Sequence, residues 1–369
     1  MAVSDAEILR LVSSGAASSR TDLARILGLA RSTVSLRVQD LLNAGLLTET
    51  GDGPSRGGRR PRVLRPAGGG GYVVGIDIGA QHARVAAYDL SGEQLIIADH
   101  SLDIAAGPET CLGELVDIVG TLTLDGQRLQ GVGVGLPGPV HYEDGRVEGA
   151  SRMPGWNGFP VRDWLASRLG VQVVVDNDAN MVALGEFHTR NRGPEHLVVV
   201  KAGTGVGCGV IVAGAIHRGA NGVAGDVSHV RVSAGADRPC SCGNTGCLET
   251  IASGAAVAKS VGVTHTADLL DLVANLDPRA TAAVRQAGGR LGEVLSTVVN
   301  FFNPHAVLLT GSLATIEPFV AAVRGALYER CLPMATQNLE VAVASAGAAA
   351  GALGAGQLAL QAVHSKGKD

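Results

Sequence analysis

The chain has 369 residues, of which 46% are apolar, and this length allows two or three domains with cores of their own. The most apolar window, Leu197 to Ile216, contains a lysine and five glycines, so no segment is predicted to span a membrane. Met1 to Arg10 lacks the apolar run of a secretion signal, and both observations favour a cytoplasmic protein.

Positive charge is concentrated near the start of the chain. The net charge is −4, yet residues 1–66 contain ten arginines against six aspartates and glutamates, a local charge of +4. A basic segment of this kind is typical of DNA contact. The N-terminal residues are therefore the first candidates for a nucleic-acid interface.

Residues 1–66 are predicted to form a winged helix-turn-helix. Short helices are expected around Ile8 and over Thr21 to Leu27, and a third should run from an N-cap at Ser32 to about Ala44. Val34, Val38 and Leu41 follow one another at helical spacing and predict one buried stripe. Leu46 to Glu49 should begin the strand of the wing.

The third helix is the predicted recognition helix. In a helix-turn-helix, side chains at the start of this helix reach base edges in the major groove. Arginine can bind guanine through two hydrogen bonds, and serine can contact either a base or a phosphate. The candidate contacts are Arg31, Ser32, Thr33, Ser35 and Arg37. The plainer alternative is a helical bundle or dimerisation module without DNA contact.

Residues 51–71 are rich in glycine and proline, so we expect a wing and linker without a packed element. Their arginines suit a narrow minor groove, because its strong negative potential attracts guanidinium groups. The candidates are Arg59, Arg60 and Arg62. Alternatively, this run is a solvated linker.

From residue 72 onward the hydrophobic pattern becomes that of an α/β protein. Tyr72 to Ile78, Ala83 to Leu90 and Leu95 to Ala98 are predicted strands, and His196 to Lys201 and Val206 to Val212 repeat the same strand–glycine loop–strand unit. The repetition predicts two related lobes that face a cleft. Predicted helices cover Glu109–Leu122, Val161–Leu169, Ala179–His188, Pro278–Phe302, Glu317–Tyr328 and Ala348–His364.

Three of the six cysteines lie within eight residues, at Cys240, Cys242 and Cys247. Three thiolates and one imidazole make a closed tetrahedral zinc site, and His229 is the best candidate for the fourth ligand. Such a site is usually structural. The alternatives are three unrelated buried cysteines or a redox sensor.

Asn177 and Asp178 follow an apolar strand and precede a helix, a position where α/β proteins often bind ligands. The carboxylate of Asp178 can accept a proton from a sugar hydroxyl, and the amide of Asn177 can both donate and accept hydrogen bonds. The plainer interpretation is that this pair only caps the helix.

These motifs together resemble the ROK family, which comprises repressors, open reading frames and kinases. Its fold is the actin-like, ribonuclease H-like α/β fold of sugar kinases, with two lobes around a cleft. The resemblance covers nearly the whole chain, since the regulator branch of the family has a winged helix-turn-helix in front. It implies a small lobe over 72–189, to which 348–365 return, and a large lobe with the zinc site over 190–347.

The resemblance also implies roles for single residues. Asp178 matches the catalytic base, and Asn177, Glu249 and the loop containing Gly138 match contacts to the sugar. His229 matches a zinc ligand whose outer ring nitrogen also meets the sugar. The phosphate loops match Asp77 with Gly79, then Gly203, Thr204 and Gly205, and finally Gly311.

The chain departs from the kinases mainly at the ATP end of the cleft. The kinase pattern Asp-x-Gly-Gly-Thr-Lys is here Asp77 to His82, and Ser312 follows Gly311 where the kinases have further glycines. Phosphoryl transfer depends on positioning and charge neutralisation, so these changes weaken the case for ATP and Mg²⁺. On the sugar side, Asp226 replaces a glutamate.

The sequence therefore favours a cytoplasmic transcriptional regulator, a repressor of carbohydrate metabolism that binds a DNA operator and a sugar effector. Structural Zn²⁺ is expected, and the family implies a homodimer or homotetramer. Two alternatives stay open. One is an active ATP-dependent sugar kinase with a DNA-binding head. The other is a regulator whose pocket binds a phosphorylated ligand, a non-sugar ligand or nothing, and which works through a partner.

Overall fold

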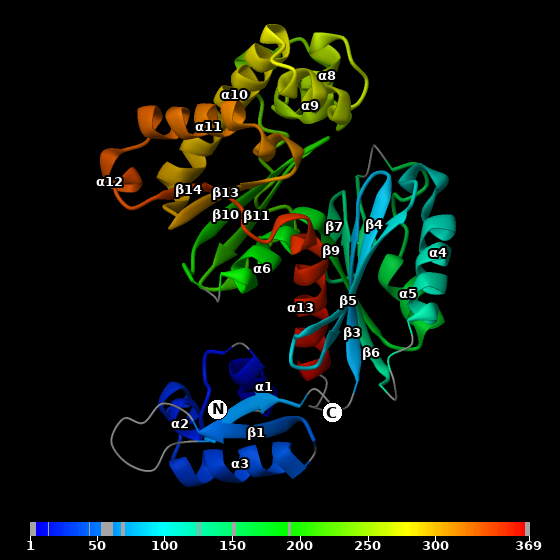
Figure 1. Cartoon of the computed structure of the whole chain (residues 1–369), viewed down its shortest axis with the longest axis vertical. Helices are drawn as coiled ribbons and strands as arrows, with labels where there is room; N and C mark the ends of the chain where they lie inside the picture. Colours follow the sequence, from blue (N-terminus) through cyan, green and yellow to red (C-terminus); the bar gives the residue numbers. More distant parts are fainter. Residues whose placement is uncertain are drawn as a thin grey trace.

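The computed structural model describes residues 5–13, 15–43, 45–52, 62–67, 71–122, 124, 127–149, 153–190 and 193–365. A small N-terminal head is followed by two lobes, each built around a five-stranded sheet (Figure 1). A long C-terminal helix runs from the region between the two lobes towards the head.

The head is a three-helix unit with a two-stranded wing. Its elements are α1 (Asp5–Ser13), α2 (Arg20–Leu27), α3 (Arg31–Asn43), β1 (Leu47–Asp52) and β2 (Arg62–Pro66). The predicted stripe of Val34, Val38 and Leu41 is buried against the other two helices. Gly28 ends α2 in the left-handed conformation (φ 64°), as its position after the apolar run predicts.

Two expectations for the head were wrong. Ser32 is not an N-cap, because α3 already begins at Arg31 and the amide of Val34 donates to the carbonyl of Ala30. The segment 51–71 also contains a packed element, since β2 pairs antiparallel with β1 and Leu64 is 3% exposed in the core of the head. Pairing with β1 and the burial of Leu64 outweigh the surrounding glycines and prolines.

The first lobe is built on a sheet with the strand order β5-β4-β3-β6-β9. One face carries α4 (Pro108–Thr121) and α5 (Val161–Leu169), whose leucines pack against the centre of the sheet. The opposite face packs against α13 (Ala350–Ser365). The strands are β3 (Tyr72–Ile78), β4 (His82–Asp89), β5 (Gln94–Ser101), β6 (Leu129–Leu136) and β9 (Gln172–Asn177), and a small hairpin joins β7 (Val140–His141) and β8 (Arg146–Val147).

The second lobe repeats this plan with the order β12-β11-β10-β13-β14. One face packs against α10 (Pro278–Phe302) and α11 (Glu317–Arg330), and the other against α6 (Asp178–Thr189). The strands are β10 (Leu197–Ala202), β11 (Val206–Val212), β12 (Ala215–Ile216), β13 (Ala306–Thr310) and β14 (Glu340–Val343). The remaining helices are α7 (Glu249–Ala252), α8 (Gly254–Val261), α9 (Thr266–Ala274) and α12 (Pro333–Thr336).

In both sheets a central strand pairs antiparallel with the next strand and parallel with a later one. This confirms the two related lobes and the actin-like α/β class expected from the sequence. Helices α6 and α13 pack closely on each other where the lobes meet. A Cβ at Gly354 would lie 1.8 Å from the carbonyl oxygen of Met181, so only glycine permits this approach.

The C-terminal helix also touches the head. Its start lies beside β3 and α6, and the same helix contacts α1 (Figure 1). In the part of the chain that the structure describes, no helix is both long and apolar enough to cross a membrane.

Candidate ligand cleft, metal centre and DNA interface

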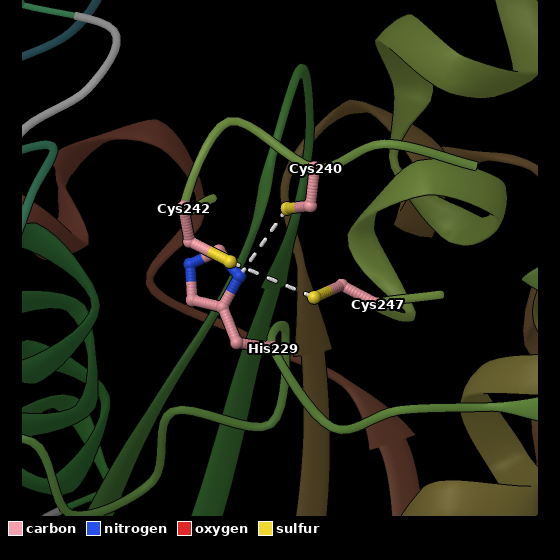
Figure 2. A group of neighbouring side chains, drawn as sticks. All are labelled: His229, Cys240, Cys242 and Cys247. Carbon is pink, nitrogen blue, oxygen red and sulfur yellow. Dashed lines mark hydrogen bonds between the residues drawn. The ribbon is translucent and has the colours of Figure 1, made fainter. Parts of the chain in front are cut away.

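The three clustered cysteines and His229 converge on one point (Figure 2). Their four ligand atoms all lie within 4.8 Å of one another, although the residues are spread over positions 229–247 of the segment before α7. Nδ1 of His229 is 3.6 Å from Sγ of Cys240, and Sγ of Cys242 is 3.7 Å from Sγ of Cys247. The fourth ligand chosen from the sequence is thus the imidazole that the fold supplies.

These distances fit a tetrahedral zinc ion. With usual zinc–sulfur and zinc–nitrogen bond lengths, the edges of the tetrahedron are about 3.8 Å between two sulfurs and about 3.6 Å from sulfur to nitrogen. A disulfide would need the sulfurs about 2 Å apart, and all three cysteines are free. The donor set therefore suits a structural Zn²⁺, which would hold the loop of residues 229–247 together.

Two predicted sugar contacts adjoin the metal centre. The amide of Glu249 donates to the carbonyl of Ser228, and the buried Glu249 carboxylate accepts from the amide of Val206 at 2.9 Å. Asp226 is exposed and accepts from the hydroxyl of Ser228 at 2.6 Å. The carboxylate of Glu249 is thus held by the start of β11 and that of Asp226 by Ser228, the residue before His229.

The side chain of Asn177 serves two purposes at the start of α6. Its Oδ1 accepts from the amide of Ala179 and caps the helix, and its Nδ2 donates to the carbonyl of Gly138 at 3.0 Å. The capping interpretation is therefore correct for Asn177, but the same residue also fixes the loop that contains Gly138. Asp178 is the first residue of the helix, where the helix dipole favours a carboxylate.

The two later candidate phosphate loops lie at the ends of two neighbouring strands. Gly203 to Gly205 join β10 to β11, and Gly311 follows β13, the parallel neighbour of β10. A Cβ at Gly203 would lie 3.8 Å from Oγ of Ser312, so the serine that replaces a glycine lies directly against this loop. The carbonyls of Gly203 and Thr204 accept hydrogen bonds from the first amides of α8.

The first phosphate loop is partly covered by its own histidine. A Cβ at Gly79 would lie 2.4 Å from the ring of His82, so the imidazole rests on the glycine. Asp77, at the end of β3, is 6% exposed, and its Oδ1 has no hydrogen-bond partner among the described residues. Burial raises the pKa of this carboxyl group; nearby Lys201 lowers it and Asp178 raises it.

The sequence patterns did not single out Lys201. Its Nζ lies 2.7 Å from Oδ2 of Asp178, and its side chain is 28% exposed. Burial alone would lower the pKa of the ammonium group, but the carboxylates of Asp178 and Asp77 outweigh this and raise it. One signal for Lys201 was available in the sequence. This lysine ends a run of three valines and lies two residues before a glycine-rich loop.

A second ion pair links the lobes and was also not predicted. Nε of Arg218, which follows β12, donates to Oδ2 of Asp176 in β9 at 2.7 Å, and Asp176 is 2% exposed. The guanidinium lies 3.7 Å from the ring centre of Tyr142. Because Asp176 precedes Asn177, this contact fixes the strand end that carries the predicted sugar residues.

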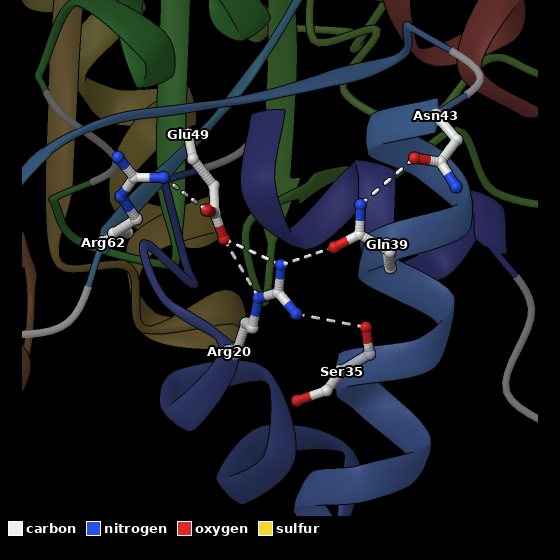
Figure 3. A network of polar contacts seen from close by, with 6 residues as sticks. All are labelled: Arg20, Ser35, Gln39, Asn43, Glu49 and Arg62. Atoms are coloured by element: carbon white, nitrogen blue, oxygen red, sulfur yellow. Dashed lines mark hydrogen bonds and ion pairs between the residues drawn. The ribbon is translucent and has the colours of Figure 1, made fainter.

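The head has a polar network that joins its wing to α3 (Figure 3). Arg20, at the start of α2, donates to Glu49 of β1 at 2.8 Å and to the carbonyl of Ser35 at 3.2 Å. Arg62 lies 3.3 Å from the same glutamate. Arg62, a candidate minor-groove contact, thus belongs to β2 and to an ion pair, and its side chain remains 70% exposed.

The start of α3 is open to contact. Arg31, Ser32 and Thr33 are exposed, while Ser35 and Arg37 are half-buried. Arg59 and Arg60 lie outside the described residues, so their assignment to a minor groove stays a prediction.

A winged helix-turn-helix on a two-lobed sugar-kinase fold defines a class of DNA-binding regulators. Family comparison agrees: residues 73–362 match the ROK family, and residues 3–48 match a winged helix-turn-helix DNA-binding family. The chain belongs to the ROK family.

Among its relatives, the xylose repressor of Bacillus spizizenii is 30% identical over 353 residues, which cover 93% of this chain and 91% of the repressor. A crystal structure of a ROK family transcriptional regulator, a homologue of the Escherichia coli MLC protein, covers 97% of this chain and 96% of its own, with a TM-score of 0.79 and 24% identity. A ROK family glucokinase from Streptomyces griseus, crystallised with glucose and AMPPNP, covers 79% of this chain and 100% of its own, with a TM-score of 0.68 and 26% identity.

Proposed function

We propose that this protein is a transcriptional repressor that binds an operator through its head and releases it when a free sugar enters the cleft. The observation that supports the proposal is a DNA-binding head joined to a sugar-kinase fold in which the candidate sugar-binding groups are retained. Asn177, Glu249 and His229 are each held by a hydrogen bond or by the metal cluster. Such a regulator acts on the cytoplasmic nucleoid.

The first effector to test is xylose. The 30% identical relative over nearly the whole chain is a xylose repressor, and several further relatives carry the same name. Asp226 reaches less far than the glutamate of the kinase pattern, and a shorter side chain changes which ring hydroxyls it can meet. N-acetylglucosamine is the main competitor, because another relative is the N-acetylglucosamine repressor of Escherichia coli.

The fold offers a direct route from the cleft to the head. The start of α13 touches the phosphate-loop aspartate, because a Cβ at Gly351 would lie 2.3 Å from Cγ of Asp77. The same helix packs on α6, which begins at Asp178, and contacts α1 of the head. Closing the lobes on a sugar would therefore move α13 against the head and change DNA affinity.

Zinc would be held by His229, Cys240, Cys242 and Cys247, and it would fix the imidazole so that Nε2 points away from the cluster. A neutral imidazole held in this way can exchange a hydrogen bond with a sugar hydroxyl. Cleft residues would then bind the sugar only when the metal loop is formed.

A homodimer would place two heads on a palindromic operator. Large apolar side chains are exposed together where α10 ends and α12 begins. Phe301 is 92% exposed and Met334 89%, and the amide of Leu332 donates to Asn300, which precedes Phe301. A second copy of the chain is the occupant that two-fold DNA binding requires.

The test measures operator binding by fluorescence anisotropy with the native promoter fragment, with and without sugars. Xylose or another free sugar should weaken binding of the zinc-loaded protein, and Glu249→Gln should abolish this response while leaving basal DNA affinity unchanged. Operator affinity that no free sugar alters would contradict the proposal and favour a phosphorylated ligand or a protein partner.

The alternative function is an ATP-dependent sugar kinase, which the retained Asp178 at the start of α6 favours. A kinase would release ADP only in the presence of a sugar, and Asp178→Asn would abolish the release. Sugar-dependent ADP release lost in that variant would establish enzyme activity.

A further inference from the structure

We propose that Lys201 is a built-in cation between Asp77 and Asp178, and that it excludes Mg²⁺ from the end of the cleft where a kinase would hold it. This role does not depend on which sugar, if any, the protein binds.

Lys201 occupies a position at which the fold expects an apolar side chain. Along β10, Leu197 and Val199 point to the same face as Lys201, and both are fully buried against α6 and its neighbours. Val198, Val200 and Ala202 point to the other face, into the core under α10. A charged group on the α6 face stays stable only when it is paired, and the chain has just four lysines in all.

The partner of this lysine is the first residue of α6. The ammonium lies 2.7 Å from Oδ2 of Asp178, whose side chain is only 13% exposed. Asp77 is the second carboxylate close enough to interact electrostatically, and its Oδ1 accepts no hydrogen bond from any described residue. The ammonium therefore compensates one carboxylate by direct contact and the other through the local field.

Without the lysine, this arrangement would be suited to Mg²⁺. Magnesium is commonly held by one or two carboxylates together with substrate phosphates, and here two carboxylates are close enough to act on each other electrostatically. Other groups that act electrostatically on Asp77 are engaged elsewhere: the ring of His82 lies on Gly79, and Arg84 pairs with Asp99 at 2.7 Å. Lys201 is thus the cation placed to compete with the metal.

The consequence for Asp178 follows from the same contact. The ammonium occupies Oδ2 of Asp178, so this oxygen is not free to take a proton from a sugar hydroxyl, although the carboxylate can still accept a hydrogen bond from one. Asp178 would therefore orient a sugar without activating it, and ATP would find no bound metal. The residues present do not fit a phosphoryl-transfer centre, although they do fit a sugar sensor.

The test is the effect of millimolar Mg²⁺ on the melting temperature of the zinc-loaded full chain. Lys201→Met removes the charge but keeps the length of the side chain, so the exposed acidic pair should now bind Mg²⁺ and the variant should melt roughly 5 °C higher with the metal. Wild type, Lys201→Arg and the matched control Lys259→Met, which alters an exposed lysine of α8, should not respond. Absence of a Mg²⁺ response in Lys201→Met would overturn the inference, as would a response in wild type that Asp77→Asn removes.

A second measurement needs no variant of Lys201 and so remains decisive if Lys201→Met does not fold. Mn²⁺ is titrated into wild type and followed by electron paramagnetic resonance, with Asp77→Asn and Asp178→Asn beside it. Equal binding in all three supports a cleft closed to divalent ions. If wild type binds Mn²⁺ and either variant binds less of it, the inference is overturned. Sugar-dependent DNA release is measured separately, so failure here leaves the sensor proposal standing.

Discussion

Single residues decide whether the metal loop forms. Cys242 is exposed and Cys247 is buried, yet their sulfurs lie 3.7 Å apart. Two thiols at this distance form at most a weak hydrogen bond, whereas a bound metal would hold both sulfurs there. The loop of residues 229–247 contains little regular structure, so the ligand bonds would supply much of its stability.

We predict that Cys242→Ser loses one equivalent of zinc, lowers the melting temperature by several degrees and abolishes the sugar response. Zinc is measured by mass spectrometry of the protein, and the sugar response by thermal shift. Cys111→Ser is the matched control, since Cys111 is buried in the first lobe away from the cluster and should keep zinc. A Cys242→Ser protein that retains its zinc would show that the ligand set is wrong.

At the scale of elements, α13 connects the ligand cleft to the head, and close packing makes this possible. Its glycines face α6 and the first sheet without side chains, so the helix lies as near as two backbones allow. Packed interfaces of this kind move as units rather than deform, which suits a helix that transmits a displacement.

Gly354→Ala should destabilise the protein by about 1–3 kcal/mol, because the added methyl group would clash with the backbone of α6. Gly289→Ala is the opposing control: it lies in the interior of α10 with open space around it, and alanine there should stabilise by about 0.5–1 kcal/mol. Chemical denaturation measures both. Equal effects of the two substitutions would remove the argument for close packing.

The wing is the second element with a testable role. We predict that replacing Arg59 and Arg60 with alanine weakens operator binding and reduces the slope of log affinity against log salt by about 2, one per lost phosphate contact. Replacing Arg279 and Arg285 of α10, two exposed arginines far along the chain from the head, should leave the slope unchanged. If replacing Arg59 and Arg60 leaves the salt slope unchanged, as expected for the control pair, these two arginines do not contact DNA.

The sequence predicted α5 and α10 to the residue, because sharp local signals mark their ends. Pro278 follows the capping Asp277, and Gly170 ends α5 in the left-handed conformation. The cluster of four candidate metal ligands was predicted because its members lie close together in the sequence. Contacts between Lys201 and Asp178 could not be predicted, since they depend on how β10 lies against α6. The strand β2 was missed because only two apolar residues, Val63 and Leu64, stood among arginines, glycines and prolines.

At the scale of the whole molecule, two lobes, a connecting helix and a head form one chain of contacts. The proposed two-fold operator recognition would need a second copy, and the apolar surface of Phe301, Leu332 and Met334 is the proposed contact. Met334→Asp should convert a dimer to a monomer in analytical ultracentrifugation and weaken operator binding at least tenfold, because each head then binds alone. An unchanged sedimentation coefficient would place the dimer contact elsewhere.

The most direct test of the central claim is operator binding of the zinc-loaded protein, measured by fluorescence anisotropy, across a panel of free sugars and their phosphates. The account predicts that one free sugar, xylose first, weakens binding at least tenfold without ATP or Mg²⁺, and that Glu249→Gln removes this response. Operator affinity that changes only with phosphorylated sugars, or only when ATP and Mg²⁺ are supplied, would contradict it.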